Sequence, residues 1–291
     1  MQNGVTVAGG NANGDKLDQL SHPKGLFVDD DQTIYVADTH NHRIIEWKKN
    51  ATNGRIVAGG NGQGERDDQL DGPINVIIDK RNDFIIICDR GNSRVMRWRK
   101  DYKSGEIIIS NIDCSGLIMD NYGYLYISDI DRHEVRRWKI GDKEGIKVAG
   151  GNGRGHGLNQ LSYPYYFFLD QDQSVYVSDY YNHRVMKWMR NAKEGILVAG
   201  GQGEENGLKQ LSSPYGIVVD QSSTLYVVDS DNHHVTRWLK GAQKCSVIVG
   251  GNEQGEQANL LSTPMDLTFD RQNNLYVVDS ENHRIQRFDT I

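Results

Sequence analysis

Short runs of alternating apolar and polar residues, separated by polar turns, fill this chain. In the first complete unit, residues 25–29 form a short apolar run that ends at an aspartate, and residues 34–38 alternate cleanly. Residues 43–48 and 55–58 continue the pattern. Four runs of about five residues, rich in β-branched and aromatic side chains and separated by Gly, Asn and Asp, predict one antiparallel β-sheet.

This unit recurs six times. The aspartates that end the second strands are Asp38, Asp89, Asp129, Asp179, Asp229 and Asp279, and the aromatic residues that close the third strands are Trp47, Trp98, Trp138, Trp188, Trp238 and Phe288. Successive aspartates are 51, 40, 50, 50 and 50 residues apart, a period typical of propellers and solenoids. The pattern predicts an all-β fold, a six-bladed β-propeller of four-stranded antiparallel blades. Because the repeat fills the chain, residues 1–291 are expected to form a single domain.

The two ends of the chain predict how the propeller closes. Residues 5–8 have the pattern of a fourth strand with no unit before it, and residues 283–288 have that of a third strand with no unit after it. We expect the N-terminal strand to complete the last blade, because this pairing covers an otherwise open sheet edge.

A long loop joins each unit to the next and ends at a proline in five of six cases. These prolines are Pro23, Pro73, Pro164, Pro214 and Pro264. A residue before proline is biased toward extended geometry, which leads into the next strand. The third unit lacks ten residues of this loop and has Cys114 where the proline would stand, which accounts for the spacing of 40.

The composition argues against a segment that spans a membrane. The mean hydropathy is −0.63, and no apolar run approaches the ~18 residues of a membrane helix, so no membrane span is expected.

The three cysteines, Cys88, Cys114 and Cys245, fall at unrelated repeat positions. They therefore predict neither a disulfide framework nor a metal site, and Cys88, inside an apolar run, is expected to pack as a small hydrophobe.

Charge argues against nucleic acid. The net charge is −6, and the loops before the prolines are acidic. Their acidic residues are Asp15, Asp18, Glu65, Asp67, Asp68, Asp71, Glu204, Glu205, Glu253 and Glu256, against the basic residues Lys16, Arg66, Arg154 and Lys209. Since nucleic-acid binding relies on a positive surface, no nucleic-acid partner is expected.

The repeated motifs Val-Ala-Gly-Gly-Asn-Gly, Gln-Leu-x-x-Pro, Tyr-Val-x-Asp and Asn-His-Arg-Val resemble the NHL-repeat family over residues 4–288. The resemblance implies a six-bladed β-propeller. It also implies several functions, because the family includes protein-interaction platforms, RNA-binding modules, extracellular sensor domains and a zinc-dependent peptide-amidating lyase. The fold therefore leaves the function open.

The motif residues themselves predict structural roles. The aspartate is expected to accept backbone N–H bonds at a tight turn and to pair with the arginine five residues on. The closing aromatic is expected to pack between blades. The recurring histidines begin the third strands, too far apart across a propeller for one metal ion to gather them.

Catalytic residues are not evident. The lyase would require histidines directly after the loop prolines, where Lys24, Ile74, Tyr165, Tyr215 and Met265 stand instead. Propellers that resemble lactonases use carboxylates and asparagines at the channel mouth. The metal set is therefore unknown, with Asp266, Asp231 and Glu281 as weak candidates for a Ca²⁺ site and no other cofactor expected.

The fourth unit is aromatic where the others are not. It carries Tyr163, Tyr165, Tyr166, Tyr180 and Tyr181, and the fifth unit adds Tyr215. Tyrosine offers a flat apolar face with a polar tip, which suits a peptide or a sugar ring. We predict that Tyr165, Tyr166, Tyr181 and Tyr215 line a shallow site near the channel mouth, with Arg90 and Lys24 within reach of an acidic group. The alternative, that some rings only fill space between blades, stays open.

These observations favour a non-catalytic binding or interaction domain for a protein, peptide or glycan. The alternatives are a metal-dependent hydrolase or lyase at the channel mouth and, with less support, an RNA-binding module. We expect a monomer. The ligand, the flanking domains and the compartment are left open, an extracellular domain of a larger protein being one option.

Overall fold

The structure, a computed structural model, describes residues 2–201, 210–251 and 253–289. It contains two compact units. The terminal unit comprises Gln2–Cys114 and Gly255–Ile291, and the middle unit comprises Ser115–Gln254. Three charged loop residues of the sequence analysis, Glu204, Glu205 and Lys209, lie outside the described residues. That the whole chain is one domain stays a prediction.

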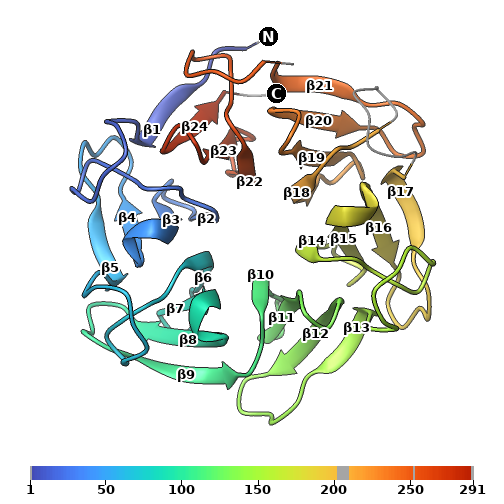
Figure 1. The fold of residues 1–291 in the computed structure, drawn as a ribbon, viewed down its shortest axis with the longest axis horizontal. Helices are drawn as coiled ribbons and strands as arrows, with labels where there is room; N and C mark the ends of the chain where they lie inside the picture. The colour runs from blue at the N-terminus through green and yellow to red at the C-terminus, as the bar shows by residue number, and fades with distance from the viewer. Residues whose placement is uncertain (1, 202–209, 252, 290–291) are drawn as a thin grey trace. The chain divides into compact units, whose positions relative to one another are not determined.

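The terminal unit contains three four-stranded antiparallel sheets, which we call blades 1, 2 and 6 (Figure 1). Blade 1 consists of β2 (Leu26–Val28), β3 (Ile34–Asp38), β4 (Arg43–Trp47) and β5 (Arg55–Gly59). Blade 2 consists of β6 (Pro73–Asp79), β7 (Phe84–Asp89), β8 (Arg94–Arg99) and β9 (Gly105–Ser110). Blade 6 consists of β22 (Pro264–Phe269), β23 (Leu275–Asp279), β24 (Arg284–Phe288) and β1 (Val5–Gly9).

The middle unit contains blades 3, 4 and 5. Blade 3 consists of β10 (Cys114–Met119), whose first residue belongs to the terminal unit, β11 (Tyr124–Asp129), β12 (Glu134–Lys139) and β13 (Ile146–Gly150). Blade 4 consists of β14 (Pro164–Leu169), β15 (Val175–Asp179), β16 (Arg184–Trp188) and β17 (Ile196–Gly200). Blade 5 consists of β18 (Pro214–Val219), β19 (Leu225–Asp229), β20 (His234–Trp238) and β21 (Ser246–Gly250).

The predicted fold class is confirmed: the chain forms six four-stranded antiparallel blades of a β-propeller. Three short 3₁₀ turns, η1 (Thr39–Asn41), η2 (Arg90–Asn92) and η3 (Tyr180–Asn182), follow the second strands of their blades. The N-terminal strand completes the last blade as predicted, because β1 pairs antiparallel with β24 from Val5 opposite Arg287 to Gly9 opposite Arg284.

The repeated aromatic residue packs between neighbouring blades, as the sequence analysis expects. Trp188 of blade 4 is only 2% exposed and shares a core cluster with Tyr126, Val135 and Ala149 of blade 3. Gly195 lies against this ring, since a Cβ atom built there would fall 2.9 Å from Cε3 of Trp188. Gly54, Gly105 and Gly145 lie against Trp47, Trp98 and Trp138 in the same way, so a glycine makes room for the indole in blades 1 to 4.

The cysteine prediction is wrong for one pair. Cys88 in β7 and Cys114 at the start of β10 form a disulfide with their Cα atoms 5.8 Å apart. Both side chains are fully buried. Cys88 is therefore not a free hydrophobic residue, and Cys114, at the junction that lacks the proline loop, is held to β7 by a covalent bond. Cys245 is a free, partly buried thiol.

Candidate functional site

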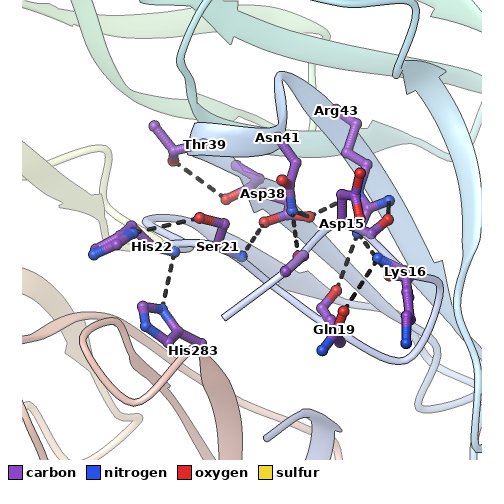
Figure 2. A network of polar contacts seen from close by, with 12 residues as sticks. Asp15, Lys16, Gln19, Ser21, His22, Asp38, Thr39, Asn41, Arg43 and His283 are labelled. Atoms are coloured by element: carbon purple, nitrogen blue, oxygen red, sulfur yellow. Dashed lines mark hydrogen bonds and ion pairs between the residues drawn. The ribbon is translucent and has the colours of Figure 1, made fainter. Parts of the chain in front are cut away.

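A polar frame of an asparagine and an arginine surrounds the aspartate that ends the second strand in blades 1, 2, 4 and 6, and Figure 2 shows it in blade 1. In blade 1, Oδ1 of Asp38 accepts the backbone N–H of Ser21 at 2.7 Å, and Oδ2 accepts from Asn41 Nδ2 at 2.8 Å and Arg43 Nε at 2.7 Å. Burial raises the pKa of the Asp38 carboxyl, while the hydrogen bonds from Asn41 and Ser21 oppose that rise. The predicted aspartate–arginine pair is confirmed, and its role is structural.

The arginine of this frame also holds the proline loop. Nη1 of Arg43 donates to the carbonyl of Asp15 at 2.6 Å, and Nη2 donates to the carbonyls of Lys16 and Gln19, each at 3.0 Å. Arg184 in blade 4 makes the equivalent bonds to its own loop. The frame therefore positions the residues around it and offers no chemistry of its own.

The recurring histidine belongs to the same frame. His42 has a left-handed backbone with φ 51°, a conformation that histidine tolerates better than β-branched residues do. Its Nδ1 accepts the N–H of Gly72 in the next loop at 3.1 Å. His133 and His283 accept from the N–H groups of Tyr163 and His22 in the same way. These contacts explain the histidines without a metal.

Three positions in each unit, next to this frame, hold residues of different chemical type in different blades. We call them the variable positions. They are the residue after the loop proline, or after Cys114, and the two residues after the repeated aspartate. The first holds Lys24, Ile74, Ser115, Tyr165, Tyr215 and Met265, and the other two hold Thr39-His40, Arg90-Gly91, Ile130-Asp131, Tyr180-Tyr181, Ser230-Asp231 and Ser280-Glu281. Because four blades share the frame while these positions differ, the variable positions are the candidates for ligand specificity.

The middle unit brings the predicted tyrosines into one connected group, the tyrosine cluster, of Tyr163, Tyr165, Tyr166, Tyr180, Tyr181 and Tyr215. Tyr165 in β14 stacks on Tyr215 in β18, with ring centroids 4.7 Å apart, and meets Tyr180 in η3 edge-on at 4.9 Å. Tyr181 contacts Tyr180 at 4.9 Å and Tyr163 at 4.8 Å, both edge-on. Stacked and edge-to-face contacts at these distances are the favourable arrangements for aromatic pairs.

The rings of the cluster differ in exposure. Tyr166 and Tyr215 are 5% and 6% exposed and form its floor, whereas Tyr181 is 50% exposed. Tyr165 is half-buried. The burial of the two floor rings agrees with the open alternative that part of the cluster fills space between blades. That all four predicted residues line one binding site stays a prediction.

Sequence reasoning missed Arg154 as a member of this site. Its guanidinium lies 5.1 Å from the ring centroid of Tyr163 and 5.6 Å from that of Tyr181, and its Nε donates to Ser162 Oγ at 3.1 Å. A signal was present, because the equivalent residues of the first two loops are the uncharged Asn13 and Gln63. Arg154 adds a positive charge at the exposed edge of the cluster.

The other two predicted residues, Lys24 and Arg90, lie together in the terminal unit. Both line a hollow of about 600 Å³ between blades 1 and 2. Arg90 makes a bidentate pair with Asp113, at 2.7 Å from Nε and 3.3 Å from Nη2. Burial, and then the positive charge of Arg90, lowers the pKa of the Lys24 ammonium. Asp113 was missed by the sequence analysis. That all six predicted residues belong to one binding site stays a prediction.

The three weak metal candidates each have a protein partner. The two carboxylate oxygens of Asp266 accept the N–H groups of Leu26 at 3.1 Å and Leu267 at 2.8 Å. Asp231 accepts the hydroxyl of Ser213, and Glu281 Oε2 lies 3.6 Å from Nε2 of His22. Among the described residues, no group of three or more His, Cys, Asp or Glu side chains is arranged to hold a metal ion. The Ca²⁺ site stays a prediction.

Two segments of the chain match a family model, the NHL repeat, at residues 20–46 and 261–288. Both segments contain the aspartate frame of their blade, and the predicted resemblance is confirmed. The chain carries NHL repeats. No curated protein matches this NHL-repeat chain in sequence. No helix among its described residues is long and apolar enough to cross a membrane.

Solved structures share the fold of this NHL-repeat chain at low sequence identity. A protein of unknown function from Bacteroides thetaiotaomicron is 15% identical, with a TM-score of 0.78, over 99% of this chain and 76% of its own. An auxiliary nutrient binding protein from the same organism is 16% identical, with a TM-score of 0.75 and the same coverage. An inactive variant of virginiamycin B lyase from Staphylococcus aureus, solved with quinupristin, is 12% identical, with a TM-score of 0.61, over 99% of this chain and 88% of its own. At these identities the likeness shows the fold alone.

Asp266 predicts a pH dependence for the NHL-repeat chain. Burial raises the pKa of this carboxyl to about 7, against about 3.9 in an unfolded chain. The folded state therefore binds more protons between these values, so the contribution of Asp266 to the free energy of unfolding falls as pH rises from about 4 to about 7. Asparagine does not titrate. The free energy of unfolding of Asp266→Asn minus that of the parent should therefore increase over this range, by roughly 3–4 kcal/mol.

Urea unfolding of both proteins at several pH values measures this difference. Asp220→Asn is a suitable control, because Asp220 is only partly buried at a turn. Parallel pH profiles for the parent and Asp266→Asn would contradict the raised pKa.

Proposed function

We propose that this NHL-repeat chain is a non-catalytic binding domain that recognises a protein, peptide or glycan through the tyrosine cluster. The observation that carries the proposal is the concentration of tyrosines at the variable positions of blades 4 and 5. Three of the variable positions of blade 4 and the first of blade 5 hold tyrosine. Their rings contact one another, and the outermost ring remains half exposed.

The arrangement of the rings favours binding over simple space filling. Tyr181 is 50% exposed while its ring contacts those of Tyr180 and Tyr163, so the cluster presents an aromatic surface to a ligand. The ring of Tyr165 stacks on the buried ring of Tyr215, which in turn contacts the buried ring of Tyr166. A rigid, supported aromatic surface loses little conformational entropy when a ligand binds, which raises affinity.

The chemistry of the cluster suits a ligand with flat apolar faces and polar edges. Tyrosine rings stack on sugar rings or proline rings, and their hydroxyls form hydrogen bonds at the rim. Arg154, beside Tyr163 and Tyr181, adds a guanidinium that can pair with an acidic group of the ligand. The likeness to an auxiliary nutrient binding protein is compatible with such a role.

The alternative of a metal-dependent hydrolase or lyase has weaker support. The likeness to a lyase rests on 12% identity. Asp266, Asp231 and Glu281 each face a donor or a histidine of the protein itself. Metal analysis of the purified protein separates the two functions, because a stoichiometric bound ion would favour the enzyme.

Peptide and glycan arrays test the proposed function. The parent should select a ligand, and a variant that combines Tyr165→Ser with Tyr181→Ser should bind it at least about tenfold more weakly, since central aromatic contacts contribute 1–2 kcal/mol or more. Tyr122→Ser is the matched control, because Tyr122 is 75% exposed in the same unit but lies outside the cluster. Its binding should equal that of the parent.

Two outcomes would overturn the proposal. One is an unchanged affinity of the double variant for the selected ligand at an unchanged melting temperature. The other is the absence of any selected peptide or glycan for the parent.

A further inference from the structure

Basic residues at the variable positions all surround one hollow. The variable positions carry three such residues, Lys24, His40 and Arg90, and the equivalent positions of the other units carry none. All three line the hollow of about 600 Å³ in the terminal unit, which we call the basic hollow. The remaining lining residues are Thr39, His42, Asp71, Gly72, Ile74, Gly91 and Asp113. This grouping contrasts with the net charge of −6 on the whole chain.

The two permanent cations of the basic hollow are close enough to repel each other. The charge of Arg90 contributes to the lowered pKa of Lys24, after burial of the ammonium. Two cations that share a partly desolvated site are each stabilised by an anion between them. The bidentate pair with Asp113 fixes the plane of the Arg90 guanidinium, so this donor is oriented before any ligand arrives.

Histidine side chains next to these two cations can add further positive charge when they are protonated. The ring of His40 lies 4.3 Å from that of His22, and His22 lies 4.5 Å from His283. Burial, then the charges of His22, Lys24 and His42, lowers the pKa of His40, and Glu281 opposes this effect. His40 therefore gains its proton only in mildly acidic solution, below its ordinary range.

The net charge of the side chains around the basic hollow depends on pH. With the imidazoles neutral, Lys24 and Arg90 balance Asp71 and Asp113. Asp71 Oδ1 also lies 3.5 Å from Nδ1 of His42, and Glu281 faces His22 at 3.6 Å. Each imidazole that is protonated then adds a positive charge to this balance.

We propose that the basic hollow binds a small ligand through a carboxylate or phosphate group, held between Lys24 and Arg90 and, in mildly acidic solution, by His40. A hollow of about 600 Å³ is within the usual range of small-molecule sites, roughly 300–1,000 Å³. Oxygen anions are the ligands that ammonium and guanidinium donors bind best. The proposal does not depend on the tyrosine cluster, because no tyrosine lines the basic hollow.

Calorimetric titration of the whole chain with D-glucuronate and with inorganic phosphate tests this site, and D-glucose is the neutral counterpart of glucuronate. At least one anion should bind saturably, and glucose should not bind. Glucuronate keeps the same charge over this range, so where it binds it should bind more tightly at pH 5.5 than at pH 8. Binding of phosphate alone or of glucuronate alone would identify which oxyanion the site prefers. Failure of both anions to saturate at concentrations up to roughly 10 mM, which corresponds to about 3 kcal/mol, would overturn the proposal.

Variants locate the site. Lys24→Met should weaken binding of the anion about tenfold, the value of one charged hydrogen bond. Lys48→Met, at an exposed lysine of the same unit, should leave it unchanged. His40→Gln should reduce the difference between the two pH values. The pair Arg90→Gln with Asp113→Asn keeps the charge balance and should weaken binding as Lys24→Met does. Equal affinity of the parent, Lys24→Met and the Arg90 pair would overturn the proposal.

Discussion

Deletion of residues 1–10 is expected to lower the melting temperature by more than about 10 °C. The deletion removes β1, which pairs with β24 along the outer edge of blade 6. It also removes Ala8, which is 3% exposed in a core cluster with Leu26, Trp47 and Ile285. Several backbone hydrogen bonds and a core contact are lost together, on the order of 5 kcal/mol, and the edge of β24 becomes exposed.

Circular dichroism during heating measures this effect. Deletion of residues 1–3, which precede β1, provides the control and should leave the melting temperature within a couple of degrees. If deletion of residues 1–10 changes it as little, β1 does not stabilise blade 6.

Trp188→Ala should lower the free energy of unfolding by about 3–5 kcal/mol. The ring is 2% exposed and packs against Tyr126 and Val135 of the preceding blade, so the substitution leaves a cavity between two sheets. Urea unfolding of the variant and the parent gives the difference.

The neighbouring residue supplies the control for this experiment. Met189 follows Trp188 directly and is 62% exposed, so Met189→Ala should change the free energy of unfolding by less than about 0.5 kcal/mol. A near-neutral Trp188→Ala would show that the indole is not part of the core.

The blades were predictable because each is specified by local rules that the chain repeats. Alternation with period two and turn residues recur in every unit, and the frame around Asp38 recurs in four of them, so a weak signal in one unit is supported by the others. The pairing of β1 with β24 followed from the incomplete units at the two ends. The disulfide was not predictable in this way, because Cys88 and Cys114 occupy non-equivalent repeat positions and meet only through packing.

The candidate site was predictable in its residue types and less so in its geometry. Tyr165 and Lys24 stand out because they break the repeat at variable positions. Their neighbours Arg154 and Asp113 come from loops and are brought near by folding. The burial of Tyr166 depends on the ring of Tyr215 in the next blade, and no pattern within one unit encodes that contact.

The redox state of the Cys88–Cys114 pair should reflect the compartment in which the chain folded. A compartment rich in glutathione would keep both residues as thiols, whereas an oxidising one would join them. Both sulfurs are shielded from solvent in the folded protein. Thiol–disulfide exchange requires access, so a change of surroundings after folding should alter the bond only as fast as blade 2 opens. Oxidised and reduced chains would then persist side by side as two long-lived populations with the same sequence.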